Sequence, residues 1–430
     1  MNLKLGTLNQ KSPADFAVWG IILLFAITFS LLALNRHAAF ESNGFDLGNV
    51  NQAVWNTARG QFLGFTNMLP LTNRLALHVE PVLLLLVPFY WLGVGGPEFL
   101  LVAQAVVVAL GAWPLYRIAR RRLGGWGGVV IAAAYLLYPA LEAAVMFDFH
   151  AVTLAPTFFL FTLDALEREN LPGAAVSLGL AMACKEDMGL VAAMLGLYVG
   201  LAHRRWKPAL TMAAVFLIQP MFAPGGNIQA NRYAWLFEAL AQPGLIWEHL
   251  WHRAGLPAYL WGMFAPVGGL ALLSPLALLP VLPSLAINLL SSHGLQWRLE
   301  EFHYAAPVAP FVFIAATQTI AKVIEARRQV SRFTFYVLRL PFRSPAPLLI
   351  VLIVASLSYH YYRGFTPLAR PFRWRPVTVH QQIGAEMAAQ ISADLPLFAP
   401  LNLNPHVSSR RVVLQNWDDI TPDDWLWLDV

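Results

Sequence analysis

Long apolar runs follow one another along almost the whole of this 430-residue chain. Charged residues make up 12% of the sequence and hydrophobic residues 57%, whereas a soluble protein carries about 25% charged residues. A run of about 20 apolar residues is long enough to cross a bilayer as a helix. The pattern therefore predicts an all-α polytopic membrane protein. Its eleven expected spans are 15–35, 97–118, 125–145, 150–166, 172–184, 187–203, 208–224, 257–272, 274–291, 304–321 and 345–360.

The arginine-rich loops predict the orientation of these spans. Basic loops lie at 117–122, 203–207 and 322–332, and the positive-inside rule places them in the cytoplasm. Lys4 and Lys11 place the N-terminus there too. If 15–35 crosses outward, then 97–118 must cross back for the loop 117–122 to lie in the cytoplasm. The shorter apolar stretch 79–92 therefore cannot cross fully, and we expect it to form a short juxtamembrane helix at the outer face. The chain is thus expected in the plasma or inner membrane, with an extracytoplasmic C-terminus.

Two regions follow from this topology. Residues 1–364 form the predicted transmembrane domain, which includes an outer loop at 36–96. Residues 365–430 change in composition: 377–391 has helical spacing, and three later segments have strand-like patterns. These patterns predict that residues 365–430 form a small extracytoplasmic α/β piece.

The sequence also argues against some functions. Basic clusters with interleaved aromatic residues do not occur outside the loops, which argues against nucleic-acid binding. Because Cys184 is the single cysteine, internal disulfides and zinc–thiolate clusters are excluded.

Most of the unusual acids and histidines fall on the predicted outer side, although only basic residues were used to assign it. Their gathering there predicts a polar cavity that faces outward. The residues are Asp46, His78, Glu80, Asp148, His150, Glu186, Asp187, His293, Glu300, Glu301 and His303.

The first outer segment, residues 40–60, is expected to contain an amphipathic helix at Leu47–Arg59 on the outer membrane surface. Asp46 precedes its first turn, where a carboxylate can cap free backbone N–H groups. Asp46 is therefore either a helix cap or a carboxylate free to act as a base or metal ligand. Gln52 and Trp55, on the same helix, are candidate substrate-binding residues.

Three further segments add candidate site residues. His78 and Glu80 precede a proline, and with His303 they are candidate ligands of a divalent metal; the alternative is that they are interfacial polar groups. The Lys185–Glu186–Asp187 cluster interrupts a long apolar stretch, where ionisable residues usually mark function. It is either a structural ion pair or part of a phosphate-binding site. Asp148 and Tyr304 are further candidates, because each lies at the end of an apolar run.

The ordered segments FDLGNVNQAVWNTARGQ, NRLALHVEPVLLLLVPFYWL, FDFH, CKEDMGL, HYAAPVAPF and NPHVSSRRVV resemble an uncharacterised family of bacterial multi-pass membrane proteins, known as a domain of unknown function. That family's layout in turn resembles the C-type (GT-C) glycosyltransferases, which include protein O-mannosyltransferases and lipid A aminoarabinose transferases. The resemblance implies a GT-C-like fold. It also implies transfer of a sugar from a polyprenyl-phosphate donor to an envelope acceptor at the outer face.

The resemblance assigns roles to particular residues. Asp46 matches the acidic residue of the first outer loop, and Asp148 matches a second acid, so both are expected to be catalytic. A Lys-Pro-Pro stretch of the aminoarabinose branch is replaced here by His78-Val79-Glu80-Pro81, which lacks the lysine. We expect Lys185 and Arg74 to bind the donor phosphate in its place, with Glu186 and Asp187 nearby. A divalent metal of unknown identity is an optional cofactor.

Two other functions remain open at this point. A lipid or small-molecule transporter could use Lys185, Glu186 and Asp187 as a coupling site in the membrane. A membrane scaffold could use the outer loops for docking. Walker, HExxH and GxSxG motifs are missing from the sequence, so neither nucleotide chemistry nor these hydrolase classes are supported.

Overall fold

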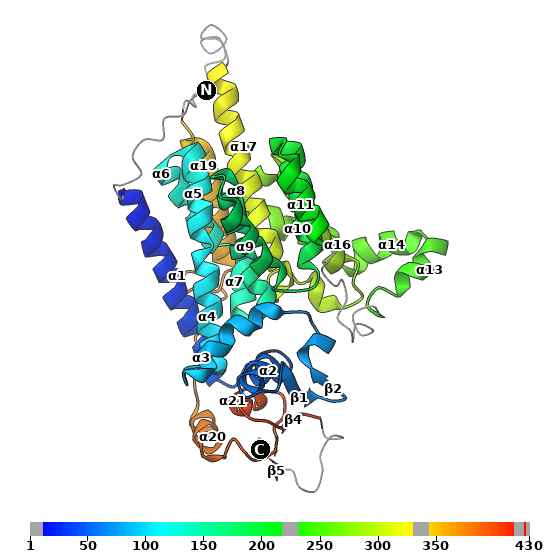
Figure 1. The fold of residues 1–430 in the computed structure, drawn as a ribbon. Helices are drawn as coiled ribbons and strands as arrows, with labels where there is room; N and C mark the ends of the chain where they lie inside the picture. Colours follow the sequence, from blue (N-terminus) through cyan, green and yellow to red (C-terminus); the bar gives the residue numbers. More distant parts are fainter. Residues whose placement is uncertain (1–11, 217–230, 330–343, 417–424, 427–430) are drawn as a thin grey trace.

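The computed structural model describes residues 12–216, 231–329, 344–416 and 425–426, and most of them are helical (Figure 1). The helices of the bundle are α1 (Pro13–Ala38), α4 (Pro97–Leu110), α5 (Ala112–Leu123), α6 (Gly125–Leu136), α7 (Pro139–Met146), α8 (Ala155–Glu167), α9 (Leu171–Met182), α10 (Met188–His203), α11 (Trp206–Phe216), α15 (Leu256–Phe264), α16 (Val281–Leu289), α17 (Ala309–Gln329) and α19 (Ala346–Arg363). Helices α13 (Trp235–Ala241) and α14 (Gly244–Glu248) project from its side (Figure 1).

Three helical segments of the described chain are long and apolar enough to cross a membrane: Pro13–Ala38, Pro97–Leu123 and His303–Ala326. The α6–α7 pair is a fourth if its 50° bend lies within one span. Proline and glycine interrupt other expected spans; at 257–272, for example, α15 ends in turns at Pro266, Gly268 and Gly269. The helical membrane fold is thus supported, while the count of eleven remains a prediction. Part of the expected span 208–224 lies outside the described residues.

Helix α1 shows how such a span divides its two faces. Ser12 and Asp15 form a capping box that starts the helix. Val18, Ile22 and Phe29 are buried against the bundle, whereas leucines such as Leu23, Leu24 and Leu31 on the other face are more than half exposed. An apolar outer face of this kind is stable in lipid but not in water.

The bundle has two chemically different ends, which α1 connects. At the end that we call the arginine end, Arg120 near the C-terminus of α5 pairs with Asp15 at the start of α1. The site end lies at the other end of α1 and carries the segment 40–91 (Figure 1). This segment contains a π-helical turn, η1 (Gly44–Gly48), helix α2 (Asn49–Thr57), antiparallel strands β1 (Gly64–Met68) and β2 (Leu71–Asn73), a 3-10 helix, η3 (Pro81–Leu86), and α3 (Val87–Trp91).

The helix expected on the membrane surface is present but begins later, at Asn49, and it is enclosed by protein. Seven of the nine α2 residues are buried, including the polar Asn49, Asn51 and Gln52. The prediction of a membrane-surface helix is therefore wrong, because those amides bond to protein groups instead of facing solvent. The stretch 79–92 is short, as expected, and consists of η3 and α3.

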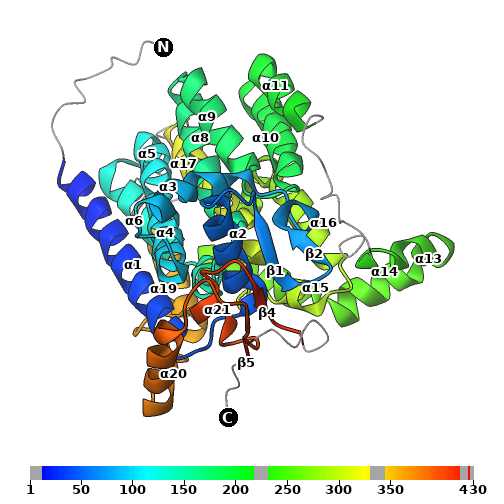
Figure 2. The ribbon, with the colours of Figure 1, turned by 60° about the horizontal axis from the view of Figure 1, so that its bottom comes forward.

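The C-terminal region packs over this segment (Figure 2). It contains α20 (Val379–Gln390), α21 (Asn404–Val407) and a parallel sheet of β3 (Leu397–Phe398), β4 (Val413–Leu414) and β5 (Trp425–Leu426), in the order β4-β3-β5. Asn51 donates to Ser408, and the Gln52 amide bonds to the carbonyls of Arg410 and Arg411. Residues 397–415 thereby hold the segment that carries Asp46, and we call them the clamp.

Candidate functional site

Asp46 and His150 face each other at the site end of the bundle. Asp46 Oδ1 lies 3.1 Å from His150 Nε2. The Asp46 side chain is 27% exposed, whereas the His150 side chain is 9% exposed. The carboxylate is therefore fixed by a buried partner but still accessible to a ligand.

Helix capping does not explain Asp46. The residue that caps the η1 turn is Asn43, whose side-chain oxygen accepts from the Phe45 N–H at 2.8 Å. Asp46 lies inside the turn and its side chain turns toward His150. Of the two roles left open by the sequence, the structure thus favours the free carboxylate.

Asp148 lies beside this pair but is completely enclosed. Arg36, near the end of α1, places Nη1 2.5 Å from Asp148 Oδ1, and the Asn43 backbone N–H donates to Oδ2 at 2.7 Å. Asp148 also has a positive φ of 47°, which is unusual for a residue other than glycine. With both carboxylate oxygens occupied and no exposure, Asp148 is suited to holding α1 and η1 together and not to contacting a substrate.

Gln104 of α4 fixes the backbone of this turn. Its Nε2 donates to the Asp148 carbonyl at 2.7 Å, and its Oε1 accepts from the His150 N–H at 2.8 Å. A buried glutamine that satisfies both groups holds the turn in one conformation. The position of the His150 ring is thereby tied to the membrane bundle.

The His150 ring stacks on His303 at a centroid distance of 3.5 Å, with 16° between the planes. Tyr304 lies against His303 at 4.2 Å and interacts with the side chain of Arg232. Asp46 and Lys185 are also close enough to Tyr304 for their charges to act on it. Residues from five separate segments thus meet in one place: 40–60, 146–150, 185–187, 232 and 303–304.

The electrostatics keep Asp46 ionised. Burial opposes the charge, but His150, Arg74 and Arg36 outweigh it and hold the pKa of Asp46 below its usual range. The pKa of Asp148 is raised instead, because of its burial and, against the opposing effect of Arg36, the Asp46 charge. Two neighbouring carboxylates therefore have shifts of opposite sign, which is common at catalytic sites.

The structure distributes the predicted phosphate- and metal-binding residues among separate contacts. Arg74 is buried and pairs with Glu80 at 2.7 Å, Glu186 pairs with His78 at 2.9 Å, and Lys185 contacts Asp187 at 3.2 Å. In the part of the chain that the structure describes, no three His, Cys, Asp or Glu side chains form a group that could hold a metal ion. His78, Glu80 and His303 face different partners, so they do not fit a shared metal site.

The two remaining candidates, Gln52 and Trp55, make contacts with other residues. The Gln52 side-chain amide is engaged with Thr66 and the clamp, so its observed contacts are structural. Trp55 lies under the guanidinium of Arg59, 3.7 Å from the ring centroid. Tyr304, in contrast, is close enough to both Asp46 and Lys185 for their charges to act on it.

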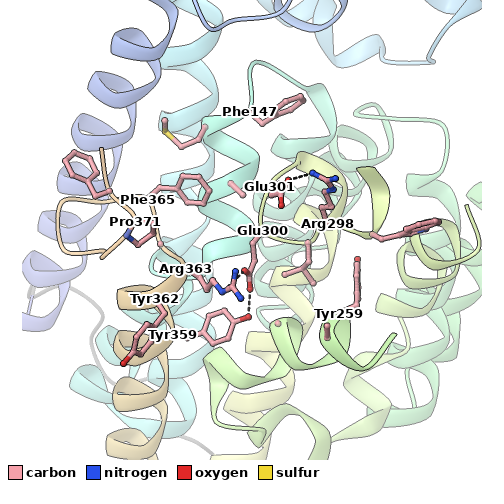
Figure 3. Close-up of a pocket in the computed structure, with 18 of the residues that line it drawn as sticks. Phe147, Tyr259, Arg298, Glu300, Glu301, Tyr359, Tyr362, Arg363, Phe365 and Pro371 are labelled. Carbon is pink, nitrogen blue, oxygen red and sulfur yellow. Dashed lines mark hydrogen bonds and ion pairs between the residues drawn. The ribbon is translucent and has the colours of Figure 1, made fainter. Parts of the chain in front are cut away.

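A cavity of 610 Å³ begins at the Arg36 side of this site (Figure 3). Arg36 and Phe147, which flank Asp148, form part of its wall. Glu300 is hydrogen-bonded to Tyr359 and Glu301 to Arg298, as the dashed lines of Figure 3 show. Aromatic and charged side chains line the rest, including Tyr259, Trp261, Trp297, Tyr362, Arg363, Phe365, Arg373 and Arg375. Such a wall can accept an amphiphilic ligand with hydroxyl groups.

Arg36, Arg232 and the arginines of the cavity were not assigned to the site from the sequence. The signal was present, since Arg36 and the group Arg363, Arg370, Arg373 and Arg375 lie on the predicted outer side, against the positive-inside trend. Arginines on the outer side run against this trend, so a local interaction is expected to account for them. For four of them it is the cavity. Arg232 also lies on the predicted outer side, between the expected spans 208–224 and 257–272, and it interacts with Tyr304.

Comparison with known proteins adds the family. Two crystal structures of ArnT from Cupriavidus metallidurans are similar, one bound to undecaprenyl phosphate (16% identity, TM-score 0.48) and one in the apo state (17% identity, TM-score 0.47). Each match covers 93% of this chain and 86% of ArnT. No curated protein matches the sequence. The model of the predicted membrane protein family DUF2079 matches residues 36–429, and the chain therefore belongs to this family of membrane proteins.

Proposed function

We propose that this protein is a membrane glycosyltransferase that moves a sugar from a polyprenyl-phosphate donor to an acceptor hydroxyl. The observation that carries the proposal is the partly exposed Asp46 carboxylate, which His150 fixes and on which the charges of Arg74 and Arg36 act. Direct displacement at the sugar needs a base at the acceptor and cations at the departing phosphate. Both kinds of group are present within this site.

In the proposed reaction the acceptor oxygen attacks the anomeric carbon as the bond from that carbon to the phosphate oxygen breaks. Asp46 takes the acceptor proton. Its lowered pKa keeps it ionised at neutral pH but makes it a weak base, so the proton is transferred late, once the acceptor oxygen has become positive. The bonding electrons leave with the lipid phosphate.

Lys185 and Arg232 are the residues that we assign to the departing phosphate, because both lie close to Tyr304, which packs against His303. Arg74 is already neutralised by Glu80 in a buried pair, so it supports Asp46 electrostatically and has no proposed contact with phosphate. The cavity at Arg36 is left for the acceptor. Asp148 acts as a positioning residue, and no step is routed through a metal.

Transport by the Lys185–Glu186–Asp187 cluster gains no support. These residues lie in the turn between α9 and α10 and are tied to the segment 78–82: the Val79 N–H donates to Glu186, and the Val82 N–H to the Ala183 carbonyl. A coupling site would have to change partners during transport. The observed contacts fasten the turn to the site end instead.

The proposal can be tested with purified full-length protein in lipid, supplied with a panel of polyprenyl-phosphate sugars. Wild type should release lipid phosphate from one of them, and Asp46→Asn should reduce the rate about 10²–10⁴-fold, the usual contribution of a general base. Lys185→Gln should mainly raise the donor KM. Glu248→Gln, which changes an exposed carboxylate paired with Arg253, is the matched control. Folded protein that releases no lipid phosphate from any donor, or Asp46→Asn at the wild-type rate, would overturn the proposal.

A further inference from the structure

A second charged cavity lies at the arginine end, away from the proposed catalytic site. It has a volume of 410 Å³ and is formed by α5, α8, α10 and the turn that follows α10. Its lining residues are Arg121, Arg122, Leu163, Leu166, Glu167, Val199, His203 and Arg205.

The charges around this cavity do not balance. Asp164, which is fully buried, forms ion pairs with Arg117, Arg121 and Arg168. Glu167 pairs with both Arg121 and Arg122, and Arg205 pairs with Glu169, whose side chain is 80% exposed. Five arginines thus share three carboxylates. A surplus of guanidinium groups beside a cavity favours an anionic ligand, and guanidinium geometry suits phosphate oxygens.

The position of the cavity selects the kind of anion. Arg121 and Arg122 lie in the last turn of α5, at the end of the membrane-spanning segment Pro97–Leu123. Arginines at the end of a span lie at the level of lipid headgroups. Leu163, Leu166 and Val199 add an apolar wall, which an acyl chain can cover but a free phosphate ion cannot.

We infer that this cavity is a binding site for the headgroup phosphate of an anionic phospholipid. The phosphate interacts with Arg205, Arg121 and Arg122, while the proximal part of the acyl chains covers the leucines. Basic pockets between helices at the cytoplasmic side of membrane proteins bind lipids in this way. The inference does not depend on the proposed transferase activity.

Native mass spectrometry of the full chain released from detergent tests this site, with dioleoylphosphatidylglycerol and dioleoylphosphatidylcholine as probes. Wild type should retain the anionic lipid and not the zwitterionic one. Arg205→Gln should weaken its binding about fivefold, the effect of one basic residue at a membrane surface. Arg205→Lys should restore part of the loss. Thermal unfolding of each variant checks that the fold is intact.

Arg253→Gln is the control, because Arg253, like Arg205, is paired with an exposed glutamate, but it lies outside the cavity. Equal retention of both lipids, or unchanged binding in Arg205→Gln, would overturn the inference. Displacement of the anionic lipid by millimolar inorganic phosphate would assign the cavity to a soluble anion and would likewise reject the lipid.

Discussion

The carboxylate of Asp46 and the imidazole of His150 are 3.1 Å apart, although 104 positions separate them in the chain. His150 in turn stacks on His303 and is held by Gln104. The contact thus links the η1 turn with α4, with the turn before η4 (Ala151–Leu154) and with the start of η10 (His303–Val308). It fixes Asp46 without enclosing it, and this is the property that a base requires.

The first prediction concerns the effect of His150 on the pH dependence of transfer. Replacing His150 with phenylalanine keeps the stack on His303 but removes the charge and the hydrogen bond that lower the pKa of Asp46. Burial then dominates and raises that pKa, so the acidic limb of kcat/KM should move to higher pH. The measurement is a pH–rate profile of wild type and His150→Phe. An unshifted acidic limb in an active variant would show that Asp46 is not the titrating base.

The second prediction concerns the Arg36–Asp148 pair. Arg36→Gln leaves the Asp148 carboxylate buried beside Asp46 without its cation, which costs about 3–5 kcal/mol for a buried pair that loses one partner. The free energy of unfolding should fall by this amount at pH 7 and by less at low pH, where Asp148 takes up a proton. Adding Asp148→Asn should recover part of the loss, because the amide removes the unpaired charge. A loss below about 1 kcal/mol at pH 7 would contradict the proposed positioning role.

The third prediction concerns Glu186. Burial opposes its charge, but His78, Lys185 and the Val79 N–H lower the pKa of Glu186 to about 2 from an ordinary value of 4.5. An acid whose pKa is lowered by folding stabilises the folded state in full at pH values above its ordinary pKa. This contribution of Glu186 to the free energy of unfolding declines as the pH falls from 4.5 toward 2. Glu186→Gln should therefore cost about 3 kcal/mol at pH 7, and the difference from wild type should narrow below pH 4.5. Unfolding measured from pH 7 to pH 3 tests this sign; the exposed Glu301→Gln should change little throughout.

The fourth prediction concerns the close contact between η1 and the clamp. A methyl group on Gly44 would lie 2.0 Å from Gln415 Oε1 and 2.8 Å from Asn404 Cβ. Gly44→Ala should therefore displace the clamp, reduce stability by about 1–3 kcal/mol and make residues 397–415 more susceptible to protease. Gly20→Ala in α1, where nothing lies within 4 Å, is the control. Equal protease resistance in both variants would show that the clamp tolerates the methyl group.

Much of this architecture is predictable from local sequence. The apolar runs indicate the spans at Pro13–Ala38 and Pro97–Leu123, since length and hydropathy suffice for a membrane helix. The C-terminal helix and the three strands also occur within the segments that the patterns indicate. The breaks at Pro266 and in the α6–α7 pair are harder to predict, because proline permits either a kink or a new helix.

The candidate site depends on contacts that local patterns do not contain. Asp46 and Lys185 were identified because charged groups beside apolar runs are costly and need a purpose. The burial of α2 and the contacts of Gln52 could not be predicted from the sequence. An amphipathic helix has the same periodicity whether its polar face is hydrogen-bonded to protein groups or to water. The contacts of Asp148 could not be predicted from the sequence for a related reason, since its partner Arg36 lies on α1, far from Asp148 along the chain.

The clamp has a consequence for how the protein is made. Asn51 and Ser408 are 357 positions apart, so the segment that carries Asp46 is synthesised and inserted long before the residues that hold it. Until they arrive, Asn51 lacks its bond to Ser408 and Gln52 lacks its bonds to the carbonyls of Arg410 and Arg411, although Gln52 can already pair with Thr66. The segment that carries Asp46 therefore acquires its full set of contacts only after the C-terminal region has been synthesised.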